Sequence, residues 1–127
     1  MAIPIQASDP DVQIFTDVTI DVPGPYVLQL TCLTDITKIA IAIVGLTGDT
    51  PNDVGIDIAT GEAASEVDVI ENLHWGDTDS LGAQGDRGQG WLIIPFFFPS
   101  GTKISARITA FERGGAFGYN FQLIAME

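Results

Sequence analysis

Residues 91–111 read WLIIPFFFPSGTKISARITAF, and this stretch contains two segments that favour β-strands. The first segment is apolar but too short to cross a membrane, because a spanning helix needs about 20 apolar residues. Its three consecutive phenylalanines favour a pleated, half-buried surface, whereas Pro95 restricts such a strand to an edge, an end or a bulge. In the second segment apolar and polar residues alternate from Lys103 to Ala110, as in a strand with one buried face. Gly101 lies between the two segments and permits a tight turn.

The same period-two alternation recurs along the chain, and residues that break secondary structure separate the repeats. No segment of ten or more residues has helical periodicity. Short strands with turns at this spacing are typical of a two-sheet sandwich. We therefore predict an all-β fold, in which residues 1–127 form a single antiparallel β-sandwich domain of about eight strands, with jelly roll the favoured topology. The other strand-like segments are residues 18–22, 26–34, 39–44, 54–58, 66–73 and 117–123.

Composition excludes several classes of protein. Hydrophobic residues make up 46% of the chain and charged residues 17%, so the chain is globular although its formal net charge is -12. Residues 1–86 hold 15 of the 17 acidic residues and a single basic one, Lys38, whereas residues 87–127 hold the other four basic residues. Because binding to nucleic acid requires clustered Lys and Arg, we expect no nucleic-acid partner. The lack of a spanning segment likewise predicts no membrane partner.

The N-terminus and the single cysteine bear on where the protein works. The first residues, MAIPIQASDPDVQ, lack a basic region and an apolar core, so we expect no secretion through a signal peptide. Residues 1–11 fit either an extended arm that docks on a neighbour or a disordered terminus.

Cys32 is the only cysteine, so the chain cannot form an internal disulfide, and Cys32 shares an alternate face with Leu28 and Leu30. The sequence therefore predicts a buried, unreactive thiol.

No constellation of residues indicates catalysis. His74 is the only histidine, and the sequence contains neither a nucleophile elbow nor a phosphate-binding or dinucleotide-binding loop. Acidic residues are abundant, but most alternate with apolar residues as the solvated side of strands, as at Asp57 and Asp68. We therefore predict that the protein is not an enzyme, binds no cofactor and has no identifiable metal site.

The segment GDTDSLGAQGDRGQG at residues 76–90 is the longest turn-rich stretch. An EF-hand is excluded because Leu81 occupies the third ligand position of that motif. A polar loop at the end of a sandwich is the more common reading, and such loops often carry recognition. We expect a recognition loop that includes four residues, namely Trp75, Asp77, Asp79 and Arg87.

The apolar run at residues 91–98 predicts a strand that is covered on both faces. The opposite sheet would cover one face, and either another subunit or the chain's own N-terminal arm and loops would cover the other. Lys103 and Arg107 share the polar face of the following strand, where they could contact an acidic surface of a neighbouring subunit or be ordinary solvated charges. The expected interface residues are Phe96, Phe97, Phe98, Lys103 and Arg107.

Two stretches resemble a group of mostly uncharacterised proteins of tailed bacteriophages and related prophages. The first, VGIDIATGEAASEVDVIENL at residues 54–73, is similar to a segment of the type D-I-x-x-G-x-A-G-S-E. The second, IPFFFPSGTKISARITA at residues 94–110, is similar to Pro-x-Gly-[Ser/Thr]-Arg-Ile-x-Ala-Arg. Ala64 stands where the group has Gly, and Lys103 stands where it has Arg. The matching residues are Asp57, Ile58, Gly61, Ala63, Ser65, Glu66, Pro99, Gly101, Thr102, Ile104, Ala106 and Arg107.

The resemblance implies a virion-associated β-sandwich. Together with the lack of a catalytic constellation, it leads us to expect a capsid decoration, or cement, protein that is made in the host cytoplasm and binds the head surface. Its partners would be copies of itself, as a homo-oligomer and most simply a trimer, and the major capsid protein. The alternative is a carbohydrate-binding or receptor-binding module of a phage fibre or tail. That alternative would use exposed aromatic residues, for which Tyr26, Trp75, Trp91 and Tyr119 are the candidates.

Overall fold

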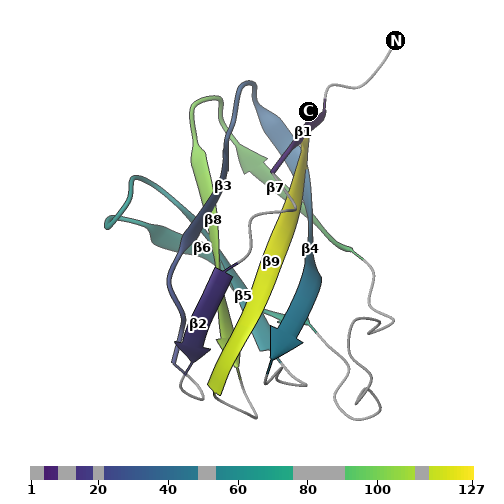
Figure 1. Cartoon of the computed structure of the whole chain (residues 1–127). Coiled ribbons are helices and arrows are strands. Elements are labelled where there is room, and N and C mark those ends of the chain that lie inside the picture. Colours follow the sequence, from purple (N-terminus) through teal and green to yellow (C-terminus); the bar gives the residue numbers. More distant parts are fainter. Residues whose placement is uncertain (1–4, 9–13, 19–21, 49–53, 76–90, 111–114) are drawn as a thin grey trace.

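The computed structural model describes residues 5–8, 14–18, 22–48, 54–75, 91–110 and 115–127, and these residues contain strands and no helix (Figure 1). The alternation seen in the sequence accounts for this, because a period of two suits a strand whose faces differ in burial. The strands are β1 (Ile5–Ala7), β2 (Ile14–Val18), β3 (Val27–Thr31), β4 (Ile36–Gly48), β5 (Val54–Thr60), β6 (Val67–Trp75), β7 (Leu92–Phe98), β8 (Lys103–Ala110) and β9 (Gly115–Met126).

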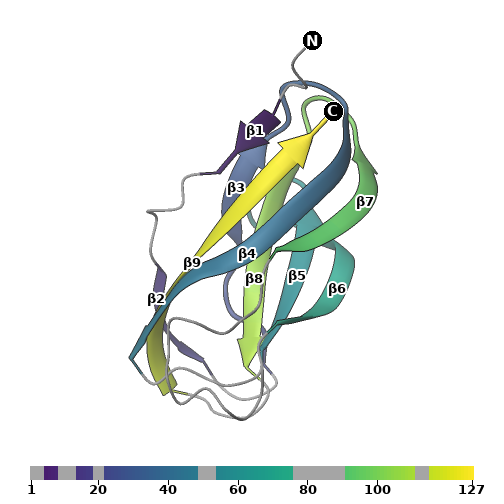
Figure 2. The ribbon, with the colours of Figure 1, turned by 90° about the vertical axis from the view of Figure 1, so that its right-hand side faces the viewer.

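The strands form two antiparallel sheets, which confirms the predicted all-β sandwich. One sheet has the order β1-β9-β4-β7, with β2 also paired to β9, and the other has the order β3-β8-β5-β6 (Figure 2). β1 and β2 pair with opposite ends of β9, since Ile5 is opposite Met126 whereas Ile14 is opposite Tyr119. The two short strands therefore share one edge of the sheet, and this division explains why nine strands are present where about eight were predicted.

The strand pairs are nested along the chain. β5 pairs with β6, β4 with β7, β3 with β8, and β1 and β2 with β9. This nested order supports the jelly-roll interpretation, which stays a prediction because the links at 49–53, 76–90 and 111–114 lie outside the described residues. The strand expected at residues 18–22 is misplaced, because β2 ends at Val18 and Val22 lies outside any strand.

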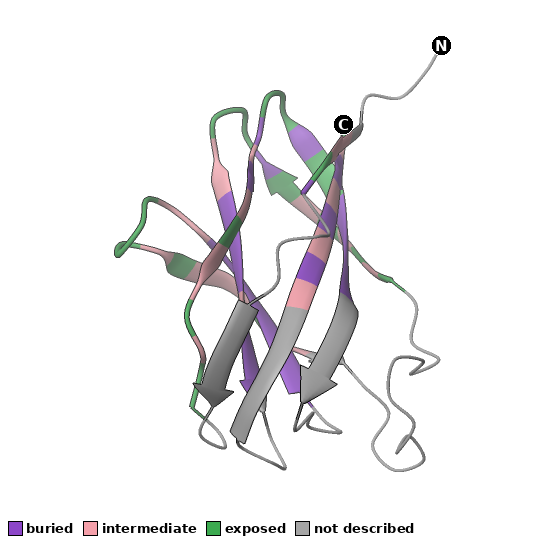
Figure 3. Cartoon of the chain, in the orientation of Figure 1, coloured by how far each residue is buried: buried purple, intermediate pink, exposed green. Residues whose placement is uncertain are grey.

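The core lies between the inner faces of the two sheets. Ile39 and Ile41 of β4 face it from one sheet, and Ile56 and Ile58 of β5 face it from the other, all with no exposed surface. Cys32 belongs to the same core and is 2% exposed, and burial raises the pKa of its thiol. The predicted buried thiol is confirmed. Figure 3 shows buried residues along the strands and exposed ones at the turns.

A tight turn carries the chain from β7 in one sheet to β8 in the other. The amide of Thr102 donates to the carbonyl of Pro99 (3.1 Å), and Gly101 has φ of 90°, a conformation that favours glycine. The amide of Gly101 also donates to the carbonyl of Cys32 (2.7 Å), and the amide of Cys32 donates to the carbonyl of Thr102 (2.8 Å). These bonds hold the turn against the end of β3.

The prediction that residues 91–98 are covered on both faces is wrong for the single chain. β7 lies at the edge of the five-stranded sheet, which suits Pro95. Leu92, Ile94 and Phe96 pack against the core, whereas the alternate residues of the strand are exposed. The run looks apolar throughout because its outward residues are apolar too, although this chain does not cover them.

The expected N-terminal arm of residues 1–11 is partly a strand. Residues 5–7 form β1, and the hydroxyl of Ser8 accepts a hydrogen bond from the amide of Leu123 (2.8 Å). The side chain of Gln6 donates to the carbonyl of Thr31, so this segment also contacts the other sheet. Residues 1–4 and 9–11 lie outside the described part of the chain. The described portion of the arm is therefore docked on its own domain.

The hairpin between β5 and β6 contains a strained position. Ala64 has φ of 68°, in the left-handed region that costs about 1–2 kcal/mol for a residue other than glycine. Ala64→Gly should therefore raise the free energy of unfolding, by up to about 1 kcal/mol once the greater freedom of glycine in the unfolded chain is subtracted. Urea denaturation of both proteins measures the change.

Ala63→Gly is the matched control, because Ala63 is an exposed neighbour whose φ is not positive. It should lower the free energy of unfolding by about 0.5–1 kcal/mol. Equal losses in the two variants would show that Ala64 is not strained.

Candidate functional site

The outer face of the four-stranded sheet is covered to an unusual degree. Ser105 and Thr109 of β8 point away from the core, yet they are only 3% and 5% exposed. Asp57 of β5 lies beside them and is also 5% exposed. The segment that leads into β3 lies along this sheet, since the amide of Gly24 donates to the carbonyl of Ile108 (2.8 Å). Polar side chains on this face are therefore buried without belonging to the core.

Arg107 joins three strands of this sheet. It projects from β8, and its Nε donates to Oδ2 of Asp57 on β5 (2.9 Å). Its Nη2 donates to Oδ2 of Asp68 on β6 (2.7 Å). All three side chains are largely buried, with 22%, 7% and 11% of the side-chain surface exposed for Arg107, Asp57 and Asp68. The two carboxylates thus share one guanidinium in a setting where charge–charge interactions are strong.

Two further donors complete this network. The hydroxyl of Tyr26 donates to Oδ1 of Asp68 (2.7 Å), and the guanidinium of Arg107 lies over the Tyr26 ring, 4.4 Å from its centroid. The amide of Asn72 donates to Oδ1 of Asp57 (2.9 Å) from a residue with φ of 56°, within the irregular part of β6. Each of the four carboxylate oxygens therefore accepts one hydrogen bond, and the orientations of both carboxylates are fixed.

The network shifts two pKa values. Burial and, after it, the hydrogen bond to Asp68 raise the pKa of Tyr26 to about 12. Burial alone would lower the pKa of Arg107, but the hydrogen bond to Asp57 and the charge of Asp68 raise it. Arg107 is therefore a permanent cation and Tyr26 a neutral donor throughout the ordinary pH range.

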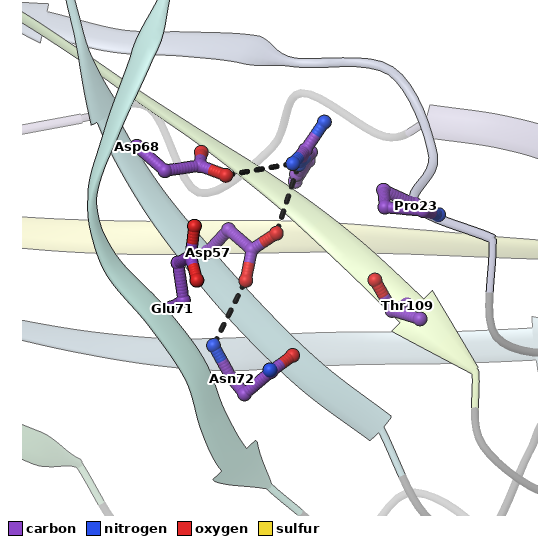
Figure 4. Close-up of a pocket in the computed structure, with 7 residues that line it drawn as sticks. Pro23, Asp57, Asp68, Glu71, Asn72 and Thr109 are labelled. Carbon is purple, nitrogen blue, oxygen red and sulfur yellow. Dashed lines mark hydrogen bonds and ion pairs between the residues drawn. The ribbon is translucent and has the colours of Figure 1, made fainter.

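A cavity of about 340 Å³ opens beside the network (Figure 4). Asp57, Asp68 and Arg107 line one side, and Pro23 and Thr109 lie across from them. Figure 4 shows the Thr109 oxygen turned toward the side where Asp57 lies. Glu71 and Asn72 are exposed and complete the lining. We call this cavity the Thr109 pocket.

A second cavity of about 260 Å³ lies farther along β8, and we call it the Ser105 pocket. Tyr26 and Leu28 line it from β3 and the segment before it, and Glu62 and Glu66 line it from the β5–β6 hairpin. Lys103 Nζ contacts Oε2 of Glu62 (2.7 Å), but both side chains are exposed, so this ion pair contributes little to stability. Tyr26 and Arg107 stand between the two pockets.

The structure separates the five predicted interface residues. Phe98 is 1% exposed and belongs to the core, and the partly buried Phe96 packs beside it with ring centroids 4.8 Å apart, so both rings lie on the inner side of β7. Phe97 is 57% exposed on the outer face of the five-stranded sheet. Lys103 and Arg107 lie on the other sheet and pair with acidic residues of their own chain, so they do not form one surface with Phe97.

The predicted recognition loop lies mostly outside the described residues. Trp75 ends β6 opposite Val54, but its side chain is not described. Asp77, Asp79 and Arg87 fall within residues 76–90, outside the described chain.

An apolar row crosses the outer face of the five-stranded sheet. Ala7 pairs with Ile124, which pairs with Ala40, which pairs with Ile93, so one apolar residue from each of four strands lies side by side. Ile93 is 64% exposed, and Trp91 just before β7 is 40% exposed. We call this surface the apolar face and define it by Ala7, Ala40, Ile93, Pro95, Phe97 and Ile124.

Sequence reasoning missed Asp57 and Asp68, which were assigned to the solvated side of strands. The outward residues that flank Asp57 on β5 are Gly55 and Ala59, and all three are buried. Because the outward residues on both sides of Asp57 are small and uncharged, the sequence could have indicated that this face of β5 is buried.

Family models, curated proteins and solved structures contain no match to this chain. No cluster of three or more metal-binding side chains occurs among the described residues, and none of their elements is a helix able to span a membrane. The two stretches that resemble phage proteins lie together, because β5 pairs with β8 and Asp57 is opposite Arg107. The resemblance itself stays a prediction.

The buried charge of Asp57 depends on Arg107 for its partner. Arg107→Met should lower the free energy of unfolding by about 3–5 kcal/mol, because it leaves the carboxylate of Asp57 buried without its cation. Lys103→Met is the control on the same strand and should cost at most about 1 kcal/mol, since its ion pair is exposed. Urea denaturation at neutral pH compares the two, and similar losses would contradict the network described here.

Tyr26 donates a hydrogen bond to Asp68. Its phenol should titrate near pH 12, as followed by NMR of ¹³C-labelled tyrosine and assigned with Tyr26→Phe. Because the folded pKa lies above the unfolded value of 10.0, this group contributes stability that is complete below pH 10 and is lost as the pH rises through 12. Asp68→Asn should move the titration toward 10. A phenol that titrates at 10 in the folded wild-type protein would be inconsistent with the bond to Asp68.

Proposed function

We propose that this protein is a structural binding module whose copies assemble through the apolar face. The observation that carries the proposal is the exposure of Ile93 and Phe97, at 64% and 57%, on one side of an edge strand. Isolated exposed apolar residues are ordinary, but here they continue a row that crosses four strands. A surface of this kind is typical of a site that another protein covers.

The apolar face is most exposed along β7. Ala40 lies in the middle of the row between Ile124 and Ile93 but is only 6% exposed, whereas Ile93 is 64% exposed. In the next row, the exposed Lys38 lies between Pro95 and Met126, so one positive charge borders the apolar row. Interface centres are typically depleted of charge, and a second copy of the same face offers a surface of matching chemistry.

Pro95 favours face-to-face packing over pairing through the sheet edge. β7 is the outer strand of its sheet, and an open edge of this kind could add strands from another chain. A proline in the strand lacks an amide donor and interrupts such a ladder. A closed oligomer is therefore the expected form, and the resemblance to tailed-phage proteins favours a trimer.

The proposed setting is the surface of a virion, where the oligomer would act as a capsid decoration protein that binds the major capsid protein. The resemblance of residues 54–73 and 94–110 to tailed-phage proteins supports this setting. Multivalent binding also supports this setting. When linked subunits each make a modest contact with a repetitive surface, the whole oligomer binds that surface tightly.

Light scattering coupled to size exclusion tests the assembly. The wild-type protein should have a mass that is a multiple of the 13.5 kDa chain, three copies for a trimer, at both low and high salt. Ile93→Ser combined with Phe97→Ser should yield the monomer, since each change removes an apolar side chain from the contact. Salt should not dissociate the oligomer, because the contact is apolar and Lys103 and Arg107 lie on the other sheet.

Val67→Ser is the matched control, because Val67 is 65% exposed but belongs to β6 of the other sheet. It should leave the mass unchanged. A monomeric wild-type protein at all concentrations, or an oligomer that persists in the double variant, would overturn assembly through the apolar face. Binding of the purified oligomer to capsids that lack it would then test the virion setting separately.

A further inference from the structure

Two buried hydroxyl groups on β8 have no hydrogen-bond partner among the described residues. Thr109 is 5% exposed and lines the Thr109 pocket, and Ser105 is 3% exposed and lines the Ser105 pocket. Buried polar groups nearly always form a hydrogen bond. Where such a group lines a cavity, its hydrogen-bond partner is a water molecule or a ligand. Each pocket thus has an unpaired hydroxyl in its lining, beside charged groups whose orientations are already fixed.

The charges around the Thr109 pocket argue against an anionic ligand. Asp57, Asp68 and Glu71 would repel an anion, and the single charge of Arg107 is already paired with the two aspartates. A ligand hydroxyl suits both kinds of group, because it donates to a carboxylate and accepts from a guanidinium or a threonine hydroxyl. Each carboxylate oxygen already accepts one bond and retains a lone pair for another, so the acceptors are held in place before a ligand arrives.

The size of the site argues for more than one ring. The Thr109 pocket, at about 340 Å³, is near the lower end of the range for small-molecule sites, and the Ser105 pocket adds about 260 Å³. Ser105 and Thr109 are four residues apart on one strand, which separates their Cα atoms by about 13 Å. Apolar surface is available as well, from Pro23 in one pocket and from Tyr26 and Leu28 in the other.

We propose that the outer face of the four-stranded sheet binds a neutral oligosaccharide, with sugar hydroxyls on Thr109, Asp57 and Arg107 in one pocket and on Ser105 in the other. The site is built from β3, β5, β6 and β8 and uses no residue of the apolar face. This binding site is separate from the proposed assembly surface, so each copy of the chain would bind oligosaccharide. Of the aromatic residues that carbohydrate recognition would require, Tyr26 lies at this site.

A printed array of neutral, acidic and amino oligosaccharides, probed with the fluorescently labelled full chain, tests the ligand class. The best neutral oligosaccharide is then titrated into the wild-type protein by isothermal calorimetry. Thr109→Val and Ser105→Ala, which remove the hydroxyls with little change in shape, should each weaken its Kd at least tenfold. Glu71→Gln, a change of an exposed side chain that leaves the fold intact, should also weaken binding.

Ile93→Ser is the control, because it alters the other sheet and should leave the Kd unchanged. Its effect on mass, measured separately, distinguishes failure of assembly from failure of oligosaccharide binding. Several results would overturn the proposal: no neutral oligosaccharide binds, only amino or acidic oligosaccharides bind, or the Thr109, Ser105 and Glu71 variants bind as tightly as the wild type.

Discussion

The ion pairs of Arg107 are the interaction on which the four-stranded sheet depends. One guanidinium on β8 holds carboxylates from β5 and β6 and covers the ring of Tyr26 beside β3. Backbone pairing alone would leave this face open to water, since it points away from the core. With the network in place, the face is closed, the acceptors are oriented, and cavities remain on either side of the Arg107 side chain.

The two outer faces of the sandwich therefore differ in chemistry. One sheet presents buried charges and unpaired hydroxyls, and the other presents a flat row of apolar side chains. Assembly through the apolar face would leave the polar face of every subunit turned toward solvent. A weak oligosaccharide site, repeated in each copy of an oligomer, would then bind a surface rich in glycans with gain from multivalency. The two proposals thus support each other, although they rest on separate observations.

Local pattern was enough to predict β3 to β9, because a period of two depends only on neighbouring residues, but it missed β1 and misplaced β2. It predicted the core face of β8 and the turn at Gly101 correctly. It could not tell which faces are covered, since Asp57 and Arg107 lie fifty residues apart in sequence and meet only when β5 pairs with β8. The same limit explains the error at residues 96–98, where Phe97 is exposed and its two neighbours are not.

The residues on which the predicted resemblance to phage proteins rests have structural roles in this sheet. Gly61 has φ of 118°, and a Cβ there would lie 3.0 Å from the carbonyl oxygen of Ser65. Ile104 and Ala106 are fully buried in the core, and Asp57 with Arg107 forms the central ion pair. Each of these residues therefore belongs to the hairpin, the core or the network of one sheet, whether or not the predicted resemblance holds. The resemblance bears on how that sheet is built, whereas the apolar face lies on the other sheet and its role depends on its own exposure.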